Sequence, residues 1–417
     1  MTGLVGPAGQ RGSAGPAARP VPAAWLAALA GPLSFGITGP TLVLGELQRD
    51  LGVSLVSASA VVTAFGWGIA VGTPLTGGLL ARRGLRPAML LAAALVLLGS
   101  TLAMAAPVLV DGGTALVASV LGAGVQGIGS AGFAVVGLQL AGSAAAMGAV
   151  TATMASLGAV APLVGAQVSA LLGWPAVLGL PLLSLLAAPA VLRTASRSVQ
   201  AGAGAAGAGD PLGAGLLVAW VTALVFVPAQ PLPAGLAVLA LTAALAMRLR
   251  RRPDGFVPAS VPRSAVFAGS AALAFGLAVV NFGIVYAAPG LLAARTGWSS
   301  AQLGTAFLVP YLAGGALSWF LVAGSARLGG RALAVALAGV AGLAVAAVTF
   351  GAEVPALVFA AMLLGSLAAA TGQGSLALRA TSAVPAGVRP AAMGLFTLCY
   401  LLGAAFGPAI AALTASG

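Results

Sequence analysis

Few side chains in this sequence can carry out acid–base, nucleophilic or metal chemistry. The 417 residues include no histidine, one cysteine and six acidic residues. Without histidine, no serine or cysteine nucleophile can be activated by an imidazole base, and the acids and the cysteine do not cluster at the spacing of metal ligands. We therefore expect no enzyme activity, no metal site and no cofactor.

The polar residues inside the long apolar runs are neutral. A few such groups in an apolar pocket suit a small lipophilic substrate, because they can orient it through hydrogen bonds. The candidate substrate contacts are Gln126, Gln167, Asn281, Tyr286, Tyr311 and Gln373. The alternative for each residue is an interhelical hydrogen bond, which is a common use of Gln and Asn in helix bundles.

The elements that must position these residues are membrane-spanning helices. The chain is 60% hydrophobic and only 6% charged, and its mean hydropathy is +1.11. Soluble domains carry about 25% charged residues. A span needs about 20 mostly apolar residues, and such runs fill most of the chain. We expect an all-α polytopic protein in the lipid bilayer. The basic residues are dispersed between the runs, so we expect no nucleic-acid partner despite the net charge of +12.

The apolar runs form two groups around a linker. After a disordered tail at residues 1–22, an N-terminal six-helix bundle is expected over 23–193, a central linker with an inserted helical hairpin (about 212–249) over 194–263, and a C-terminal bundle of five helices, with the last one missing, over 264–417. The predicted spans lie at roughly 23–45, 57–80, 87–107, 113–138, 148–172, 175–192, 265–289, 301–324, 332–350, 355–377 and 391–414. If both hairpin segments cross the membrane, the total is thirteen.

The arginines predict the orientation. All 18 basic residues are arginines, and cytoplasmic loops are enriched in basic residues. With the N-terminus in the cytoplasm, only Arg49 and Arg295 fall outside. We expect a multi-pass protein of the plasma membrane in this orientation. Glu46 and Asp50 then lie at the outer end of the first span and are the candidate residues for coupling to protons.

An internal repeat relates the two groups of spans. The segment ARRGLR at residues 81–86 returns as ARLGGR at 326–331, at an offset of 245 residues, and Pro162 returns as Pro408 at an offset of 246. Parallel repeats of six helices are typical of transporters whose central cavity opens alternately to each side. By this offset, the second group would have a sixth span beginning near residue 421.

The repeated loop resembles the signature loop of the major facilitator superfamily, G-x-L-A-D-R-x-G-R-K. The match is GGLLARRGLR at residues 77–86, where Ala81 and Leu85 replace the Asp and the second Arg. The resemblance implies gating roles for Gly77, Arg82, Gly84, Arg86, Arg327, Gly329 and Arg331. The arginines would anchor helix ends and interact with helix dipoles, and the alternative is that they serve only to orient the chain.

A second resemblance is to the exporting members of that superfamily, which carry G-x8-G-x3-G-P-x2-G-G in the fifth helix. The residues that fit are Gly148, Pro162 and Gly165 in the first half and Gly394, Gly403, Gly407 and Pro408 in the second. Small residues let helices approach closely and proline bends them. These residues are therefore candidates for conformational change, and plain packing is the alternative.

The inserted hairpin resembles that of the fourteen-helix drug:proton antiporters. This likeness implies a monomeric secondary transporter that exports small lipophilic compounds by alternating access, including drug and antibiotic efflux. The chain lacks the acid that this branch carries near Gly36, and Ala123 stands in the place of an arginine, so coupling by the usual residues is not supported. Two alternatives stay open. One is a degenerate, non-transporting relative that acts as a membrane binding or scaffold protein, and the other is a metabolite uptake permease.

Overall fold

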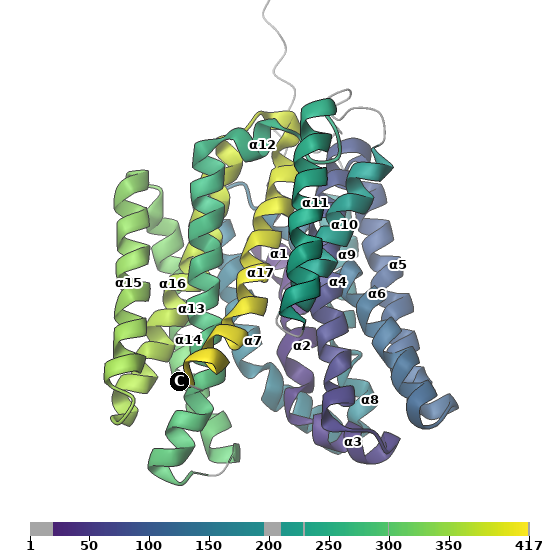
Figure 1. The fold of residues 1–417 in the computed structure, drawn as a ribbon, viewed down its shortest axis with the longest axis vertical. Helices are drawn as coiled ribbons and strands as arrows, with labels where there is room; N and C mark the ends of the chain where they lie inside the picture. Colours follow the sequence, from purple (N-terminus) through teal and green to yellow (C-terminus); the bar gives the residue numbers. More distant parts are fainter. Residues whose placement is uncertain (1–19, 196–209, 228–229, 299, 416–417) are drawn as a thin grey trace, which may run out of the picture.

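The computed structural model describes residues 20–195, 210–227, 230–298 and 300–415 (Figure 1). Within these ranges the chain is helical and contains no strand. An all-helical fold follows from the composition, because only hydrogen bonding within each segment satisfies the backbone of an apolar chain in lipid. The predicted tail lies outside the described residues except for its last three positions, and residues 196–209 of the predicted linker also lie outside them.

Four long helices form most of the first half. They are α4 (Leu55–Arg83), α5 (Leu85–Leu109), α6 (Gly112–Leu140) and α7 (Ala144–Leu172). Helix α4 begins at Ser54, whose hydroxyl accepts a hydrogen bond from the Ser57 N–H. It ends at Gly84, where φ is 79°, a backbone conformation that a side chain would strain. The helix boundaries match the ends of the predicted spans or extend them by up to four residues.

The first span is broken, where the sequence analysis expected one run over residues 23–45. It consists of α1 (Ala23–Ala30), α2 (Leu33–Thr38) and the 3-10 helix η1 (Gly39–Leu42). The following α3 (Leu44–Leu51) turns away from this axis by 63°. Pro32 and Pro40 explain the breaks, because proline has no N–H to donate and its ring clashes with the preceding turn.

The sixth span is also divided. Its pieces are α8 (Trp174–Val177), the 3-10 helix η2 (Leu180–Leu183) and α9 (Ser184–Ala195). Pro175 and Pro181 each stand in the first turn of a new piece, where the missing N–H costs nothing. Together these pieces cover the predicted span at 175–192.

The inserted hairpin and the second half follow. The hairpin is α10 (Pro211–Phe226) and α11 (Pro231–Arg251), and the short α12 (Ser260–Arg263) leads into α13 (Ala265–Thr296), α14 (Ser300–Ser325), α15 (Gly330–Phe350), α16 (Pro355–Ser382) and α17 (Arg389–Ala415). In the described part of the chain, ten helices are long and apolar enough to cross a membrane, or eleven with the bent first span. Helix α10 has 16 residues and is one of two shorter apolar helices.

The helices pack as two bundles that meet along two seams. In the first half α6 packs against α4 and α5, and in the second half α13 and α16 pack against each other and against their neighbours. The halves meet where α4 packs on α17 and where α7 packs on α14. The hairpin lies beside α4 and α17 (Figure 1).

Most arginines lie at one end of the molecule, the upper end in Figure 1, which we call the arginine-rich end. The arginines at the helix ends or loops there are Arg82, Arg83, Arg86, Arg193, Arg248, Arg250, Arg251, Arg252, Arg263, Arg327, Arg331, Arg379 and Arg389. Arg49 and Arg295 lie at the opposite end, on α3 and at the end of α13. The alternation predicted from the sequence is therefore present in the fold.

Candidate functional site

Helices α4 and α17 are joined by two glycines near the arginine-rich end. A Cβ added to Gly77 would lie 2.6 Å from the carbonyl oxygen of Pro390, and one added to Gly394 would lie 2.5 Å from the carbonyl oxygen of Thr73. Real Cβ atoms are not found at such distances from a backbone oxygen. The two backbones are therefore in contact, and neither position has room for a side chain.

Helices α7 and α14 are joined instead by a tryptophan. The indole Nε1 of Trp319 donates a hydrogen bond of 3.1 Å to the carbonyl oxygen of Ala145. A Cβ on Gly148 would lie 2.9 Å from Cδ1 of the same ring, and one on Gly315 would lie 2.8 Å from Oγ of Ser156. A Cβ on Gly148 would also lie 3.0 Å from the carbonyl oxygen of Trp319. This seam therefore combines side-chain and backbone contacts, whereas the glycines between α4 and α17 meet backbone atoms alone.

Burial along the α4–α17 seam changes from one end of the molecule to the other. Along one face of α4, Gly77 and Thr73 are buried, while Gly66 and Thr63 are exposed. Helix α17 shows the same change, from the buried Gly394 to residue 405, which is exposed. On these two helices, the face toward the other half is buried near the arginine-rich end and exposed nearer the opposite end.

The same change is present along α7 and α14. In α7, Gly148 and Thr151 are buried, and Ala155 and Ala159 further along that face are half-buried. In α14, Gly315 is buried, and Leu308 on the same face, nearer the opposite end, is half-buried. The change along these two helices is therefore weaker than along α4 and α17.

Three buried polar atoms of the second half have no hydrogen-bond partner in the described structure. They are Asn281 Oδ1 on α13, Tyr311 Oη on α14 and Thr371 Oγ1 on α16. Asn281 lies against Gly365 of α16, because a Cβ on that glycine would be 3.6 Å from Asn281 Oδ1. An unpartnered buried polar atom costs about 1–3 kcal/mol, so these groups are candidates for meeting a ligand.

The other predicted contacts are placed differently. The amide nitrogen of Gln126 donates to Ser100 Oγ at 2.6 Å and to the Leu178 carbonyl oxygen at 2.7 Å. This amide links α6 to α5 and to the segment after α8, within the first half. Gln167 on α7 is exposed and Gln373 on α16 is buried. Tyr286 on α13 is 59% exposed.

The signature loop is attached to the hairpin segment. The guanidinium carbon of Arg82 lies 4.9 Å from the ring centroid of Phe256, which is within the range of a cation–π interaction. The ring also covers Gly78, where a Cβ would approach it to 2.8 Å. Ala81 stands where the signature has its Asp. The neighbouring Arg82 is contacted by the ring of Phe256, which lies 174 residues further along the chain. Arg86 is exposed.

The equivalent loop of the second half has other contacts. Arg327, Gly329 and Arg331 are all exposed. The next glycine, Gly330, lies directly under the guanidinium group of Arg379, which comes from the last turn of α16. The two repeated loops therefore share a sequence pattern but not a partner.

Asp210 holds the base of the hairpin at the arginine-rich end. Its carboxylate accepts hydrogen bonds from Arg248 at 2.5 and 3.1 Å, from the Gly213 N–H at 2.9 Å and from the Phe256 N–H at 3.1 Å. Burial raises the pKa of this carboxyl, but Arg248 and the two N–H groups lower it further, to about 2 from an ordinary value of 3.8. The carboxylate is therefore ionised at neutral pH and connects α10, α11 and the Phe256 segment.

Glu46 and Asp50 tie α3 to the end of α7 and to α8. The hydroxyl of Ser169 donates to Glu46 Oε2, and the Trp174 indole donates to Asp50 Oδ2 at 2.7 Å. Glu46 is partly buried and Asp50 is exposed. Both acids lie at the end opposite the arginines, as the predicted topology requires.

The glycines of the exporter pattern all lie at close helix contacts. Gly148 meets Trp319, Gly165 meets the backbone of Gly39 in η1, and Gly394 meets α4. Gly403 and Gly407 both meet the backbone of α13. Pro162 lies inside α7. Pro408 lies in α17, and its side chain falls outside the described part of the structure.

Three contributors to the site are absent from the sequence-based candidates. They are Phe256, Asp210 and Trp319. The indole of Trp319 bonds to α7, and its ring is 43% exposed. The sequence does contain a signal for Asp210, because an Asp directly before Pro and a helical run is typical of an N-cap.

Two pseudo-repeated helix bundles, joined by two seams and flanked by an inserted hairpin, define a polytopic membrane transporter. The family model of the Major Facilitator Superfamily matches residues 24–408, and the chain belongs to this superfamily. No curated protein matches the sequence.

Solved structures show the same fold. The crystal structure of the human organic anion transporter MFSD10 (TETRAN) is similar over 93% of this chain and 91% of that one, with 18% sequence identity and a TM-score of 0.61. The proton:xylose symporter XylE is similar over 93% of this chain and 87% of that one, with 14% identity and a TM-score of 0.57. At these identities the likeness concerns the fold.

Proposed function

We propose that this transporter exports small lipophilic compounds, drugs and antibiotics among them, from the cytoplasm by alternating access. In this proposal it acts as a monomer in the plasma membrane, with the arginine-rich end in the cytoplasm. The structure then represents a state that is closed to the cytoplasm and accessible from outside.

The observation that carries the proposal is the neutrality of the unpartnered polar groups. Asn281, Tyr311 and Thr371 are buried without partners. The helices that carry them have charged residues only near their ends, namely Arg295 in the last turn of α13 and Arg379 in the last turn of α16. Neutral groups in apolar surroundings favour a lipophilic or weakly polar substrate over a strongly charged one.

The direction of transport rests on the exporter pattern in α7 and α17. Its glycines lie at contacts between helices, including contacts across both seams at Gly148 and Gly394. Positions of this kind would control how the seams open and close. In this proposal the acids Glu46 and Asp50 provide the proton coupling, through their contacts with Ser169 and Trp174 at the outer end.

The first experiment measures accumulation of fluorescent lipophilic cations and neutral antibiotics in an efflux-deficient bacterium, with and without a proton uncoupler. Cells with the protein are expected to accumulate less, and the uncoupler is expected to restore accumulation. Unchanged accumulation across the panel, with folded protein in the membrane, would overturn the proposal and favour a non-transporting binding or scaffold protein. Higher accumulation would favour an uptake permease.

Two variants separate substrate contact from folding. Tyr311→Phe removes a hydroxyl that has no partner in the described structure, so it is expected to lower export without lowering the melting temperature. Gln126→Leu removes an amide that makes two interhelical hydrogen bonds, so it is expected to lower the melting temperature first. Full export by a stable Tyr311→Phe protein would remove this tyrosine from the proposed substrate site.

A further inference from the structure

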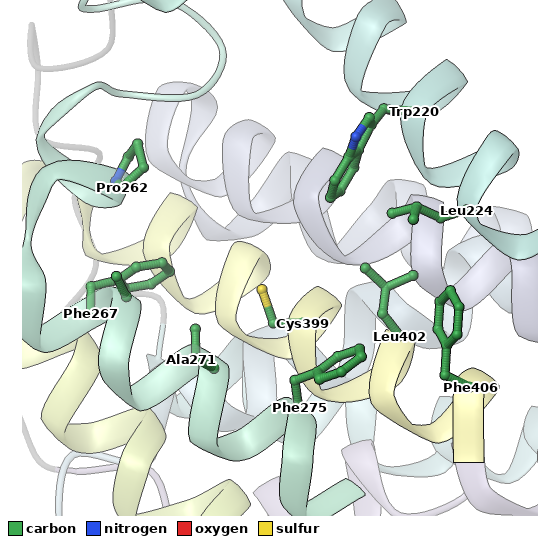
Figure 2. A pocket seen from close by; sticks show the side chains of 11 residues that line it. Trp220, Leu224, Pro262, Phe267, Ala271, Phe275, Cys399, Leu402 and Phe406 are labelled. Atoms are coloured by element: carbon green, nitrogen blue, oxygen red, sulfur yellow. The ribbon is translucent and has the colours of Figure 1, made fainter. Parts of the chain in front are cut away.

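An apolar groove lies between the hairpin and the second half. Its cavity volume is about 450 Å³, which is within the range of about 300–1,000 Å³ for ligand pockets. Residues from four helices line this hairpin groove: Trp220 and Leu224 of α10, Pro262 of α12, Phe267, Ala268, Ala271, Ala272 and Phe275 of α13, and Cys399, Leu402 and Phe406 of α17. Figure 2 shows Trp220 and Leu224 facing the α13 and α17 side chains across the groove.

The groove runs from the arginine-rich end toward the middle of the membrane. Pro262 lies in α12, at the arginine-rich end, and Phe275 lies three turns into α13. Ala268 and Ala272, two of its lining residues on α13, are exposed, so the groove opens to the surroundings of the bundle. At this depth the surroundings are hydrocarbon chains.

The walls of the groove are held by contacts of their own. The Trp220 indole donates a hydrogen bond of 2.8 Å to Thr242 Oγ1 of α11, which fixes the ring between the two hairpin helices. The base of the hairpin is fixed by Asp210 and Arg248. The groove is therefore a formed feature of the hairpin and does not result from a loose side chain.

The end of the groove near α12 is positively charged. Arg263 directly follows the lining residue Pro262 and is exposed. Arg250, Arg251 and Arg252, at the end of α11, are exposed as well, and one exposed acid, Asp254, lies beside them. Clusters of basic residues beside transmembrane helices attract anionic phospholipid headgroups, at about 1 kcal/mol per arginine.

We propose that the hairpin groove binds an anionic phospholipid of the leaflet at the arginine-rich end. One acyl chain occupies the groove between α10, α13 and α17, and the phosphate headgroup lies at Arg263 and the basic end of α11. The apolar lining accounts for the chain, and the exposed arginines account for the headgroup charge. This proposal does not depend on the substrate or the direction of transport.

The test uses the full-length protein in vesicles that contain phosphatidylglycerol with a photoreactive diazirine on one acyl chain. After irradiation, mass spectrometry of the peptides is expected to place the cross-links within residues 262–275 and 399–406. Cross-links spread evenly over other lipid-facing helices, such as α15, would overturn the proposal.

Filling the groove provides the matched comparison. Ala272 lines the groove and is exposed, so Ala272→Trp is expected to reduce these cross-links at least about fivefold without disturbing the core. Ala336→Trp places the same side chain on an exposed position of α15 and is expected to leave them unchanged. If Ala272→Trp does not fold, Ala268→Trp tests the same groove. Equal cross-linking in a folded groove variant and in Ala336→Trp would overturn the proposal.

The headgroup is tested by lipid exchange. Arg263→Gln is expected to lower the preference for phosphatidylglycerol over phosphatidylcholine by about fivefold, from the loss of one arginine, and Arg263→Lys is expected to keep it. An equal yield with both lipids in the wild-type protein would contradict the proposed headgroup site. Displacement of the cross-link by an exported drug at low concentration would show that the groove is a substrate site and would also contradict the proposal.

Discussion

The α4–α17 seam and the α7–α14 seam join the same two halves at the same end of the molecule, but with different parts of the chain. In the first seam the backbones touch at Gly77 and Gly394, and in the second Gly148 meets both the ring and the carbonyl oxygen of Trp319. A backbone contact cannot adjust, whereas a side chain can change its rotamer. The first seam therefore depends on backbone contact alone, and the second combines backbone contact with an adjustable side chain.

The two seams also differ in what covers them. Apolar residues of the hairpin, Leu217 and Val221 of α10 and Phe256, form a buried cluster with α4 and α17. The described structure has no equivalent cover on the α7–α14 seam. The hairpin contacts must therefore change when the α4–α17 seam opens. We expect this seam to resist opening more strongly than the α7–α14 seam.

The largest expected effect is on transport, from Gly394→Leu. A side chain there meets the carbonyl oxygen of Thr73, so the seam cannot close, and export is expected to fall about tenfold or more, as for an overpacked core. Gly339→Leu is the control, because a Cβ at that glycine of α15 meets no described atom within 4 Å. Equal export by the two variants would show that the backbone contact is not needed.

Asp210→Ala tests the attachment of the hairpin, which covers the α4–α17 seam. The change leaves Arg248 and two backbone N–H groups without their acceptor, and is expected to lower the free energy of unfolding by about 1–3 kcal/mol. Asp254→Ala removes an exposed acid of the same segment and is expected to have little effect. Melting temperatures of the purified proteins measure the difference, and equal values would refute the role of Asp210.

The pH dependence of Asp210 has a definite sign. Its pKa is lowered from 3.8 to about 2, so its contribution to stability is complete above about pH 4 and is lost as the pH falls toward 2. The difference in melting temperature between wild type and Asp210→Ala is expected to stay constant from pH 5 to pH 8 and to shrink below pH 4. A difference that changes near pH 6 would point to another group.

Trp319→Phe examines the α7–α14 seam. The variant keeps a ring on Gly148 but removes the donor to the Ala145 carbonyl oxygen, with an expected loss of about 0.5–1.5 kcal/mol. Export is expected to fall less than in Gly394→Leu, since the ring can still fill the seam. The ratio of export rates in matched membrane vesicles gives the comparison, and a larger loss in Trp319→Phe would reverse the order of the two seams.

The smallest effect is expected for Arg82→Gln. This substitution removes the cation–π contact with Phe256, which is worth about 0.5–1 kcal/mol at a partly exposed site. Arg83→Gln is the neighbouring control, because Arg83 is exposed. Identical melting temperatures for the two variants would indicate that the arginines serve only the orientation of the chain.

The sequence predicts the helices and the two-part organisation well, because both depend on local composition and on the repeat. It does not predict the partners of the repeated residues. Gly148 and Gly394 occupy equivalent positions of the repeat, yet Gly148 meets an indole ring as well as a backbone oxygen, and Gly394 meets backbone atoms alone. Which atoms lie opposite a glycine depends on the other half of the molecule, and the repeat pattern contains no information about that.

The polar candidates show the same limit. Gln126 and Asn281 both stand in apolar helices, and nothing in their neighbouring residues distinguishes them. In the structure the Gln126 amide bonds to Ser100 and Leu178, while Asn281 Oδ1 has no described partner. The breaks of the first span, in contrast, could be predicted from the sequence, because Pro32 and Pro40 are signals for a bent or broken helix.

The lining of the hairpin groove includes Cys399, the only sulfhydryl group among the 417 residues. Any thiol labelling of the natural protein is therefore confined to one place, without a cysteine-free background. A thiol in apolar surroundings reacts slowly, because the thiolate is the reactive form. Labelling of Cys399 would speed up where separation of the hairpin from the second half admits water, which would make the wild-type chain its own reporter of that movement.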